Sequence, residues 1–274
     1  MEPEARVDLA DDHRRFDPTF TGSLQEQRYV RDALLNLFED LWFDDVLYRV
    51  QGGKEATVYC CRAHPSTGRE LIAAKVFRPR MFRAMRNDSH YRLGRGMLDG
   101  DGKSVLDGRS RRALRKGTSY GKKLNSISWV RHEWKTLKAL HAAGADVPEP
   151  LAVDTNAILM EFVGDERGPA PVLHSVHLER DEAREVHERI LRTVETALDT
   201  YRVHADLSAY NVMMFEDELR VIDWPQCVDA SRHPDAFSLL VRDLDRLGKR
   251  FARWGFETDP IGTATEMWRD RFGM

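Results

Sequence analysis

The sequence predicts an α+β protein made of two lobes. Three observations predict this class: short β-rich runs follow an initial helix, later helices alternate with pairs of short strands, and polar residues typical of phosphate chemistry gather after the longest helix. The 274 residues suffice for two lobes with a buried core, and the hydrophobic fraction of 42% fits a soluble globular chain. Three cysteines without a C-x-x-C pair exclude a disulfide framework and give no indication of a zinc site.

The chain is expected to begin with a mobile tail and a helix. Residues 1–22 are polar, and Ser23 with Glu26 forms a capping-box pattern, in which Ser23 accepts a hydrogen bond from the first turn and Glu26 reaches back. Apolar residues then recur at helical spacing, which predicts a helix at 24–42. The polar N-terminus does not resemble a signal peptide, and no apolar run approaches about 18 residues. We therefore expect a cytoplasmic protein without a membrane segment.

A three-stranded antiparallel meander is predicted next. The runs 46–50, 57–62 and 70–77 are rich in β-forming residues and are separated by turn signals, the first of which is Gly52-Gly53. Two glycines let a backbone turn close over phosphates, which a Cβ would obstruct, although such a pair is also an ordinary hairpin turn.

The rest of the chain supplies the second lobe. The predicted elements are a helix at 126–142, strands near 151–153 and 157–162, a long helix at 179–201, a hairpin at 212–223 and a helix at 234–253. The N-terminal helix and N-lobe therefore occupy 23–160, with a basic, flexible insertion at 78–123. The hinge and C-lobe occupy 161–274.

The stretch His-Ala-Asp-Leu-Ser-Ala-Tyr-Asn, residues 204–211, carries the clearest chemistry. Asp206 and Asn211 have the D-x-x-x-x-N spacing of a phosphotransferase catalytic loop, and Asp223 ends the next apolar run. Phosphoryl transfer needs a group that orients the attacking hydroxyl and oxygen ligands for Mg²⁺. We expect Asp206 and Asp223 to be catalytic and Asn211 and Asp223 to bind the metal. His204 is expected to support the loop by packing and hydrogen bonding, with a catalytic base as the alternative.

Lys75 lies in the third predicted strand, where a kinase lysine holds the α- and β-phosphates. A charge inside an apolar strand needs a partner or contact with water. We propose Glu133 on the following helix as the partner; a solvent-facing Lys75 on an edge strand is the alternative. The order of strands, glycine turn, helix, catalytic loop and metal loop is that of a two-lobed protein-kinase-like fold.

Several segments resemble the RIO family of atypical serine/threonine protein kinases. They are Gly-Lys-Glu-Ala-Thr-Val-Tyr (53–59), Ala-Lys-Val-Phe (74–77), Met-Glu-Phe-Val-Gly (160–164), Pro-Ala-Pro-Val-Leu (169–173), the 204–211 stretch and Ile-Asp-Trp-Pro-Gln (222–226). The resemblance extends from about Leu24 to Arg253. The Pro-Ala-Pro segment favours the first RIO subfamily, and the absence of long terminal extensions favours a prokaryotic member.

The resemblance implies ATP as cofactor with Mg²⁺, or Mn²⁺ in its place. The backbone of Glu161 and Val163 would bind adenine, Met160 would be the gatekeeper, and Ser208 would touch the phosphates. The full set of implied nucleotide-binding residues is Gly52, Gly53, Lys54, Val58, Lys75, Glu133, Met160, Glu161, Val163 and Ser208. Two positions depart from the family: Ala209 replaces a frequent acidic residue, and Trp224 follows the metal aspartate, where it should alter packing without preventing metal binding.

The part of the chain after Asp223 is short. Only 51 residues follow, without an Ala-Pro-Glu signature. We therefore expect a truncated C-lobe that lacks an ordinary activation loop and peptide-binding helices. The RIO family shares this truncation, and its members are linked to maturation of the small ribosomal subunit.

The segment 78–123 has fourteen Lys or Arg against four Asp, a surplus of ten positive charges in a chain whose net charge is −3. Its charge and glycine content resist compact packing. It is either a contact for RNA or a ribosomal particle, or a solvated insertion that includes autophosphorylation sites.

Three functions follow from these patterns. The leading one is an ATP- and Mg²⁺-dependent serine/threonine protein kinase with an unknown protein substrate, which could also act as an ATPase switch. The second is a small-molecule phosphotransferase of the aminoglycoside- or choline-kinase type. The third is a nucleotide-gated, non-catalytic assembly factor.

Overall fold

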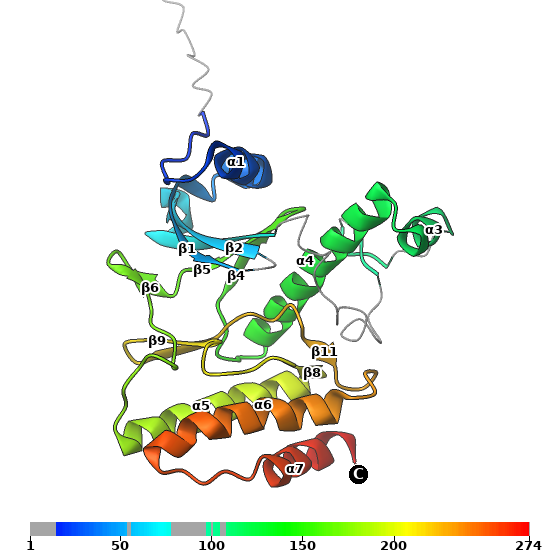
Figure 1. Cartoon of the computed structure of the whole chain (residues 1–274). Coiled ribbons are helices and arrows are strands. Elements are labelled where there is room, and N and C mark those ends of the chain that lie inside the picture. The colour runs from blue at the N-terminus through cyan, green and yellow to red at the C-terminus, as the bar shows by residue number, and fades with distance from the viewer. Residues whose placement is uncertain (1–14, 54–55, 78–96, 100, 105–107, 274) are drawn as a thin grey trace, which may run out of the picture.

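A computed structural model describes residues 15–53, 56–77, 97–99, 101–104 and 108–273, which form an upper and a lower lobe (Figure 1). The upper lobe is a five-stranded antiparallel sheet in the order β1-β2-β3-β5-β4. Its strands are β1 (Phe43–Gly52), β2 (Ala56–Ala63), β3 (Leu71–Phe77), β4 (Pro150–Val153) and β5 (Ala157–Glu161). The short 3₁₀ turn Pro65–Thr67 joins β2 to β3, where a turn was predicted.

Helix α1 (Leu24–Glu39) covers the sheet from above. Ser23 caps it by accepting a hydrogen bond from the Glu26 N–H at 3.1 Å, as predicted. The Glu26 carboxylate does not complete the expected box; it accepts a hydrogen bond from the Tyr59 hydroxyl at 2.7 Å and so fastens the helix to β2. Apolar residues of α1 pack on the sheet, and each buried leucine or phenylalanine stabilises the lobe by about 1.5–3 kcal/mol.

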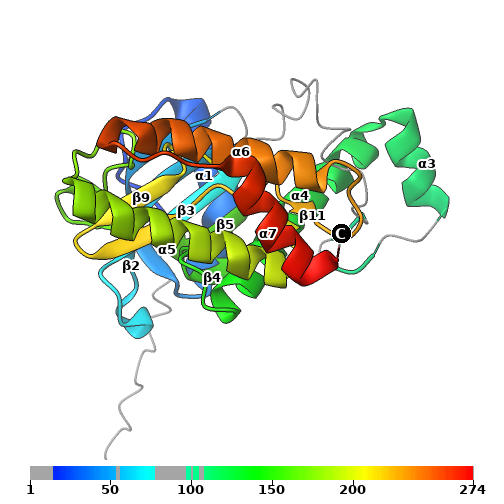
Figure 2. The ribbon, with the colours of Figure 1, turned by 90° about the horizontal axis from the view of Figure 1, so that it is seen from below.

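Helix α4 (Ser119–Ala142) connects the two lobes. Its buried residues Val130, Leu137 and Leu140 belong to the same apolar cluster as Ile158 of β5 and the C-lobe core. A short helix, α3 (Gly108–Lys116), precedes it and lies at its far end, away from the sheet (Figures 1 and 2).

The lower lobe contains three helices: α5 (Arg180–Asp199), α6 (Ala236–Phe251) and α7 (Pro260–Phe272). Figure 1 shows them beneath the strands, and in Figure 2, seen from below, they lie in front of the strands. Paired two by two above them are β9 (Val212–Phe215) with β10 (Glu218–Val221) and β8 (Arg202–Val203) with β11 (Val228–Asp229). The hinge after β5 carries a small pair, β6 (Gly164–Asp165) and β7 (Gly168–Pro169), and Ala252–Trp254 forms a 3₁₀ turn after α6.

The predicted α+β, two-lobed fold is confirmed, with three local corrections. Helix α4 begins at Ser119, seven residues before the predicted start, and α3 was not expected, so most of 108–123 is helical where the sequence indicated no regular structure. Helix α7 was also missed, although Asp259 accepts from the Gly262 N–H and Pro260 opens the helix, both ordinary start signals. The mobile tail predicted at 1–22 is wrong for its described part, because Phe16 and Phe20 are buried in the N-lobe core and the Phe20 N–H donates to the Val46 carbonyl at 3.0 Å. The flexibility expected for 1–14 and 78–96 concerns residues outside the described part of the chain.

No helix among the described residues is both long and apolar enough to cross a membrane.

Candidate active site

A cleft of about 530 Å³ separates the N-lobe sheet from the β9–β10 hairpin. The sequence-predicted residues that line it are Gly53, Val58, Lys75, Glu133, Met160, Glu161, Val163, Asp206, Asn211 and Asp223. Gly52 and Ser208 are not among its described lining residues, and Lys54 lies outside the described chain. The Ser208 hydroxyl instead accepts a hydrogen bond from the Tyr210 N–H at 3.4 Å.

Gly53 closes the β1–β2 turn beside this cleft. Its N–H donates to the Ala56 carbonyl at 2.9 Å, and an added Cβ would lie 3.2 Å from that same oxygen. The tight contact gives a local reason for a glycine at this position.

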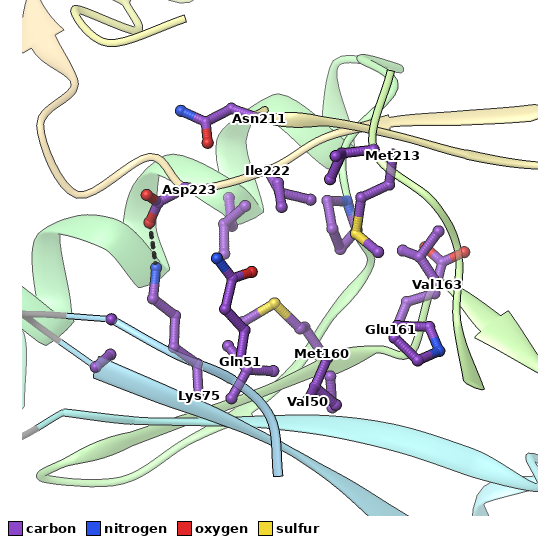
Figure 3. A pocket seen from close by; sticks show the side chains of 18 of the residues that line it. Val50, Gln51, Lys75, Met160, Glu161, Val163, Asn211, Met213, Ile222 and Asp223 are labelled. Atoms are coloured by element: carbon purple, nitrogen blue, oxygen red, sulfur yellow. Dashed lines mark hydrogen bonds and ion pairs between the residues drawn. The ribbon is translucent and has the colours of Figure 1, made fainter. Parts of the chain in front are cut away.

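Lys75 joins the two lobes across the cleft. Its Nζ donates to Glu133 Oε1 at 2.6 Å and to Asp223 Oδ1 at 2.8 Å, and the second contact is the dashed line in Figure 3. Lys75 is 8% exposed and Glu133 2% exposed, so the pair is held away from water. Burial alone would lower the pKa of Lys75, but the two carboxylates raise it above its usual range. The lysine is therefore a fixed positive charge in the cleft, and a solvent-facing Lys75 is excluded.

Asn211 and Asp223 lie side by side because the hairpin brings its two ends together. Asn211 precedes β9 and Asp223 follows β10, and the Ile222 N–H donates to the Asn211 carbonyl at 2.9 Å. Both side chains lie on the C-lobe side of the pocket in Figure 3. Burial would raise the pKa of Asp223, but the Lys75 ammonium and, more weakly, His204 lower it below its usual range. The carboxylate is therefore ionised at neutral pH.

The Asp223 backbone has a φ of 68°, in the left-handed region that aspartate tolerates better than most residues. A strained non-glycine conformation of this kind is common at functional sites.

The predicted catalytic loop, residues 204–211, is held by contacts on both sides of Asp206. The Asn211 amide donates to the Asp206 carbonyl at 2.9 Å, while Arg246 Nη1 of α6 donates to Asp206 Oδ1 at 2.6 Å. His204 is 4% exposed, its Nδ1 accepts from the Asp206 N–H at 3.3 Å, and its Nε2 lies 3.0 Å from the Ile222 carbonyl. These contacts agree with the prediction that His204 supports the loop.

Trp224 is buried directly beneath this loop. Its ring centroid lies 4.4 Å from that of His204, and its Nε1 donates to the Val221 carbonyl at 3.0 Å. Trp224 therefore packs beneath the segment that carries Asp223, whose side chain lines the cleft.

Helix α6 contributes residues that sequence reasoning missed. Asp243 is 2% exposed, and its Oδ2 accepts from the Ala205 N–H at 2.7 Å, holding a residue whose φ is 64°. Burial raises the pKa of Asp243 to about 7, against the opposing effect of Arg242. Arg242 in turn donates to the Ala205 carbonyl. The sequence did contain a signal for Asp243, because this charged residue falls on the same helical face as Leu239, Leu240, Leu244 and Leu247, which is the buried face.

The hinge presents backbone groups at the other end of the cleft. The Glu161 N–H donates to the Glu149 carbonyl at 2.8 Å, and the Val163 carbonyl accepts from the Ala170 N–H at 2.9 Å. Among the described residues, no backbone acceptor is found for the Val163 N–H. The Glu161 carboxylate is engaged by Arg220 of β10 at 3.0 Å, which fastens the hinge to the C-lobe.

Most of the apolar lining was not predicted. It comprises Val50, Ala56, Ala73, Leu137, Pro148, Phe162, Pro169, Val172, Met213 and Ile222, with Gln51, Tyr210 and Gln226 as additional polar members. Met213 and Ile222 lie within two residues of the metal-binding candidates, so alternation along the hairpin could have identified them.

The donors at Asn211 and Asp223 fit a Mg²⁺ ion. Magnesium usually takes one or two carboxylate or amide oxygens and completes its shell with phosphate oxygens and water. Among the described residues no cluster of three or more His, Cys, Asp or Glu side chains is arranged to hold a metal.

Comparison with known proteins identifies the fold and the family. A family model described as the RIO domain matches residues 102–261, more than half of the chain. The chain belongs to the RIO family. Archaeal relatives of this RIO chain include the RIO-type serine/threonine-protein kinase Rio1 of Thermoplasma acidophilum, 35% identical over 132 residues, which are 48% of this chain and 68% of that protein. The Rio1 of Haloferax volcanii is 31% identical over 228 residues, which are 83% of this chain and 70% of that protein.

Other comparisons agree on the fold. The crystal structure of the Rio2 kinase from Chaetomium thermophilum superposes with a TM-score of 0.57 at 20% identity, over 88% of this RIO chain and 68% of that one. The RIO1 kinase of the same fungus is 28% identical over 84% of this chain but only 44% of its own length. The chain thus spans about two thirds of the archaeal relatives and under half of the fungal one.

Proposed function

We propose that this RIO-family chain is an ATP- and Mg²⁺-dependent protein kinase that transfers the γ-phosphate to a serine or threonine hydroxyl, including its own. The observation that carries the proposal is Lys75, which reaches Glu133 on one side and Asp223 on the other inside the cleft that Asp206 and Asn211 also line. The names of the archaeal relatives support the same activity. We also propose a cytoplasmic location, on the sequence alone.

The phosphate end of the cleft supplies fixed charges. Lys75 would neutralise the phosphates, and its ammonium is positioned before ATP arrives because Glu133 holds it from behind. Asn211 and Asp223 would hold Mg²⁺, which supplies charge neutralisation at the transferred phosphoryl group. Since Lys75 and Asp223 are hydrogen-bonded to each other at 2.8 Å, nucleotide and metal would have to enter between them.

Asp206 would orient the attacking hydroxyl and accept its proton. Arg246 already holds Oδ1 of this carboxylate, so we assign Oδ2 to the acceptor. The peptide planes around Asp206 are fixed by Asn211 on one side and by His204 on the other, which limits the orientations of its side chain.

The hinge would bind the adenine base at the other end of the cleft. The Val163 N–H and the Glu161 carbonyl are the groups that we assign to adenine, with Met160 behind the ring. Val58 of β2 and Met213 of β9 lie on the cleft walls and would enclose the base from both lobes. Such an enclosure by apolar side chains is the usual way in which a nucleotide base is bound.

The partners expected from the sequence belong to the proposal as well. A protein substrate would present its hydroxyl at Asp206. The basic segment 78–123 would contact RNA or a ribosomal particle. In its described part, the exposed Arg109, Arg112 and Arg115 of α3 support this contact.

The fate of γ-labelled ATP tests the proposed activity. The wild type should place acid-stable label on itself or on an added acceptor protein in the presence of Mg²⁺, and Asp206→Asn should not. Label found mainly as free phosphate, and still dependent on Asp206, would indicate an ATPase switch. Transfer to an aminoglycoside or choline but not to protein would indicate a small-molecule phosphotransferase. Unchanged turnover in the Asp206 variant would contradict all three activities (protein kinase, ATPase and small-molecule phosphotransferase), because each of them depends on this carboxylate.

A further inference from the structure

A second cavity, of about 440 Å³, lies on helix α4 outside the cleft. It is formed by Arg131, Trp134, Lys135 and Lys138 of α4 together with the loop residues Asp101 and Gly102. We call it the α4 groove. Successive helical residues are rotated by about 100°, so these four positions occupy the face opposite to that of Glu133 and Leu137, which line the cleft.

The α4 groove is positively charged. Three cationic side chains line it against one carboxylate, that of Asp101. Lys135 Nζ donates to the Gly102 carbonyl at 2.6 Å, which holds the loop against the helix. Arg131 Nε is buried, and within the described part of the chain it has no hydrogen-bond partner. With two more positive than negative side chains in its lining, the α4 groove favours an anionic ligand.

An aromatic ring lies among these cations. Trp134 is partly buried against the C-lobe core, and Lys138 Nζ is 5.7 Å from the centroid of its ring. The cations at 131, 135 and 138 are spaced by about 6 and about 4.5 Å along the helix axis. A row of cations beside an aromatic side chain is the arrangement that binds backbone phosphates while a base stacks on the ring.

We propose that the α4 groove binds single-stranded nucleic acid, with Arg131, Lys135 and Lys138 on successive phosphates and Trp134 against a base. The ring favours this ligand over a phosphorylated peptide, which would use the cations alone. The concave shape disfavours a flat membrane surface. The inference goes beyond phosphoryl transfer, since none of these side chains lines the cleft, and it would stand if the kinase assignment failed.

Binding of a 5′-labelled, 12-nucleotide single-stranded RNA, followed by fluorescence anisotropy, tests the proposal. The triple variant Arg131→Gln, Lys135→Gln and Lys138→Gln should raise the Kd at least tenfold. It should also reduce the slope of log K against log salt by about 2, because each lost phosphate contact removes about 0.7.

Two further variants make the result specific. The control variant Arg232→Gln, Lys249→Gln and Arg253→Gln removes the same charge from exposed positions elsewhere and should change the Kd less than twofold. If the triple variant unfolds at a lower temperature than the wild type, the exposed Lys138→Gln alone should still raise the Kd about threefold.

Wild-type affinity in the triple variant would overturn the proposal. Equal losses in the control variant would also overturn it, because they would show that net charge and not the α4 groove determines binding. A groove variant that loses binding of a labelled phosphopeptide while keeping RNA binding would assign the groove to a different partner. Replacing Arg109, Arg112 and Arg115 of α3 tests the separate proposal for the 78–123 segment.

Discussion

Replacing Glu133 with glutamine should weaken the buried Lys75 ion pair while keeping the shape of the side chain. The two charges are 2.6 Å apart, and at an effective dielectric constant of about 20 such a pair attracts by about 6 kcal/mol. Desolvation offsets much of this, and removing one partner of a buried pair typically costs about 3–5 kcal/mol. Here Asp223 still lies 2.8 Å from Lys75, so we expect a loss of about 2 kcal/mol in the free energy of unfolding.

Equilibrium unfolding in urea of four proteins measures the free energy of unfolding and the energy of the Lys75–Glu133 interaction. The wild type, Glu133→Gln, Lys75→Met and the double variant form a cycle, and we expect a coupling energy of about 1.5–2 kcal/mol. The single glutamine variant should unfold about 3–4 °C lower than the wild type, from an unfolding entropy of about 2.1 cal/mol/K per residue.

An exposed ion pair provides the matched control. Lys249 and Asp245 lie 2.6 Å apart on the surface of α6, and Asp245→Asn should cost only about 0.3–0.5 kcal/mol. A coupling energy below about 0.3 kcal/mol for Lys75 and Glu133, or a value no larger than that of the surface pair, would refute the reasoning.

Three other variants test separate parts of the structure. Asp206→Ala should abolish turnover but change the affinity for ATP, measured by calorimetry, by no more than about threefold, because this carboxylate acts on the acceptor and not on the nucleotide. A large loss of affinity would show that Asp206 contributes to nucleotide binding instead. The native pKa of Asp243, about 7, lies above its unfolded value of 3.8, so its stabilising effect is full at low pH and is lost as pH rises through about 7. Asp243→Asn should therefore remove a fall in the free energy of unfolding between about pH 4 and 7, by at most about 1.4 kcal/mol per pH unit, and parallel pH profiles for both proteins would contradict this. Gly121→Ala should loosen α3 and speed tryptic cleavage there, because an added Cβ would lie 2.3 Å from the Ala113 carbonyl; an unchanged rate would show that the helices can separate freely.

The strands, and the proximity of the main candidate site residues, could be predicted because short sequence patterns also determine which distant residues meet. Short apolar runs ending in turns marked β9 and β10, and an antiparallel hairpin necessarily places the residue before one strand beside the residue after the other. The Lys75–Glu133 pair followed from a physical requirement, since a buried ammonium needs a counter-charge.

The parts that escaped prediction depend on tertiary contacts. Helix α3 has many like charges and α4 contains Gly121, so both resembled a loop; the glycine is needed because the two helices approach closely there. The holding of Asp206 by Arg246 and of Ala205 by Asp243 joins residues about 40 positions apart, and no local pattern signals such contacts.

Binding of a non-hydrolysable ATP analogue by calorimetry, with and without Mg²⁺, tests most directly whether the cleft between the lobes is a metal-dependent nucleotide site. We expect Mg²⁺ to strengthen binding to the wild type and to the surface variant Lys249→Gln alike, and Asp223→Asn to lose at least about tenfold of that enhancement. Equal affinities for the wild type and Asp223→Asn at every Mg²⁺ concentration would contradict the assignment of this cleft.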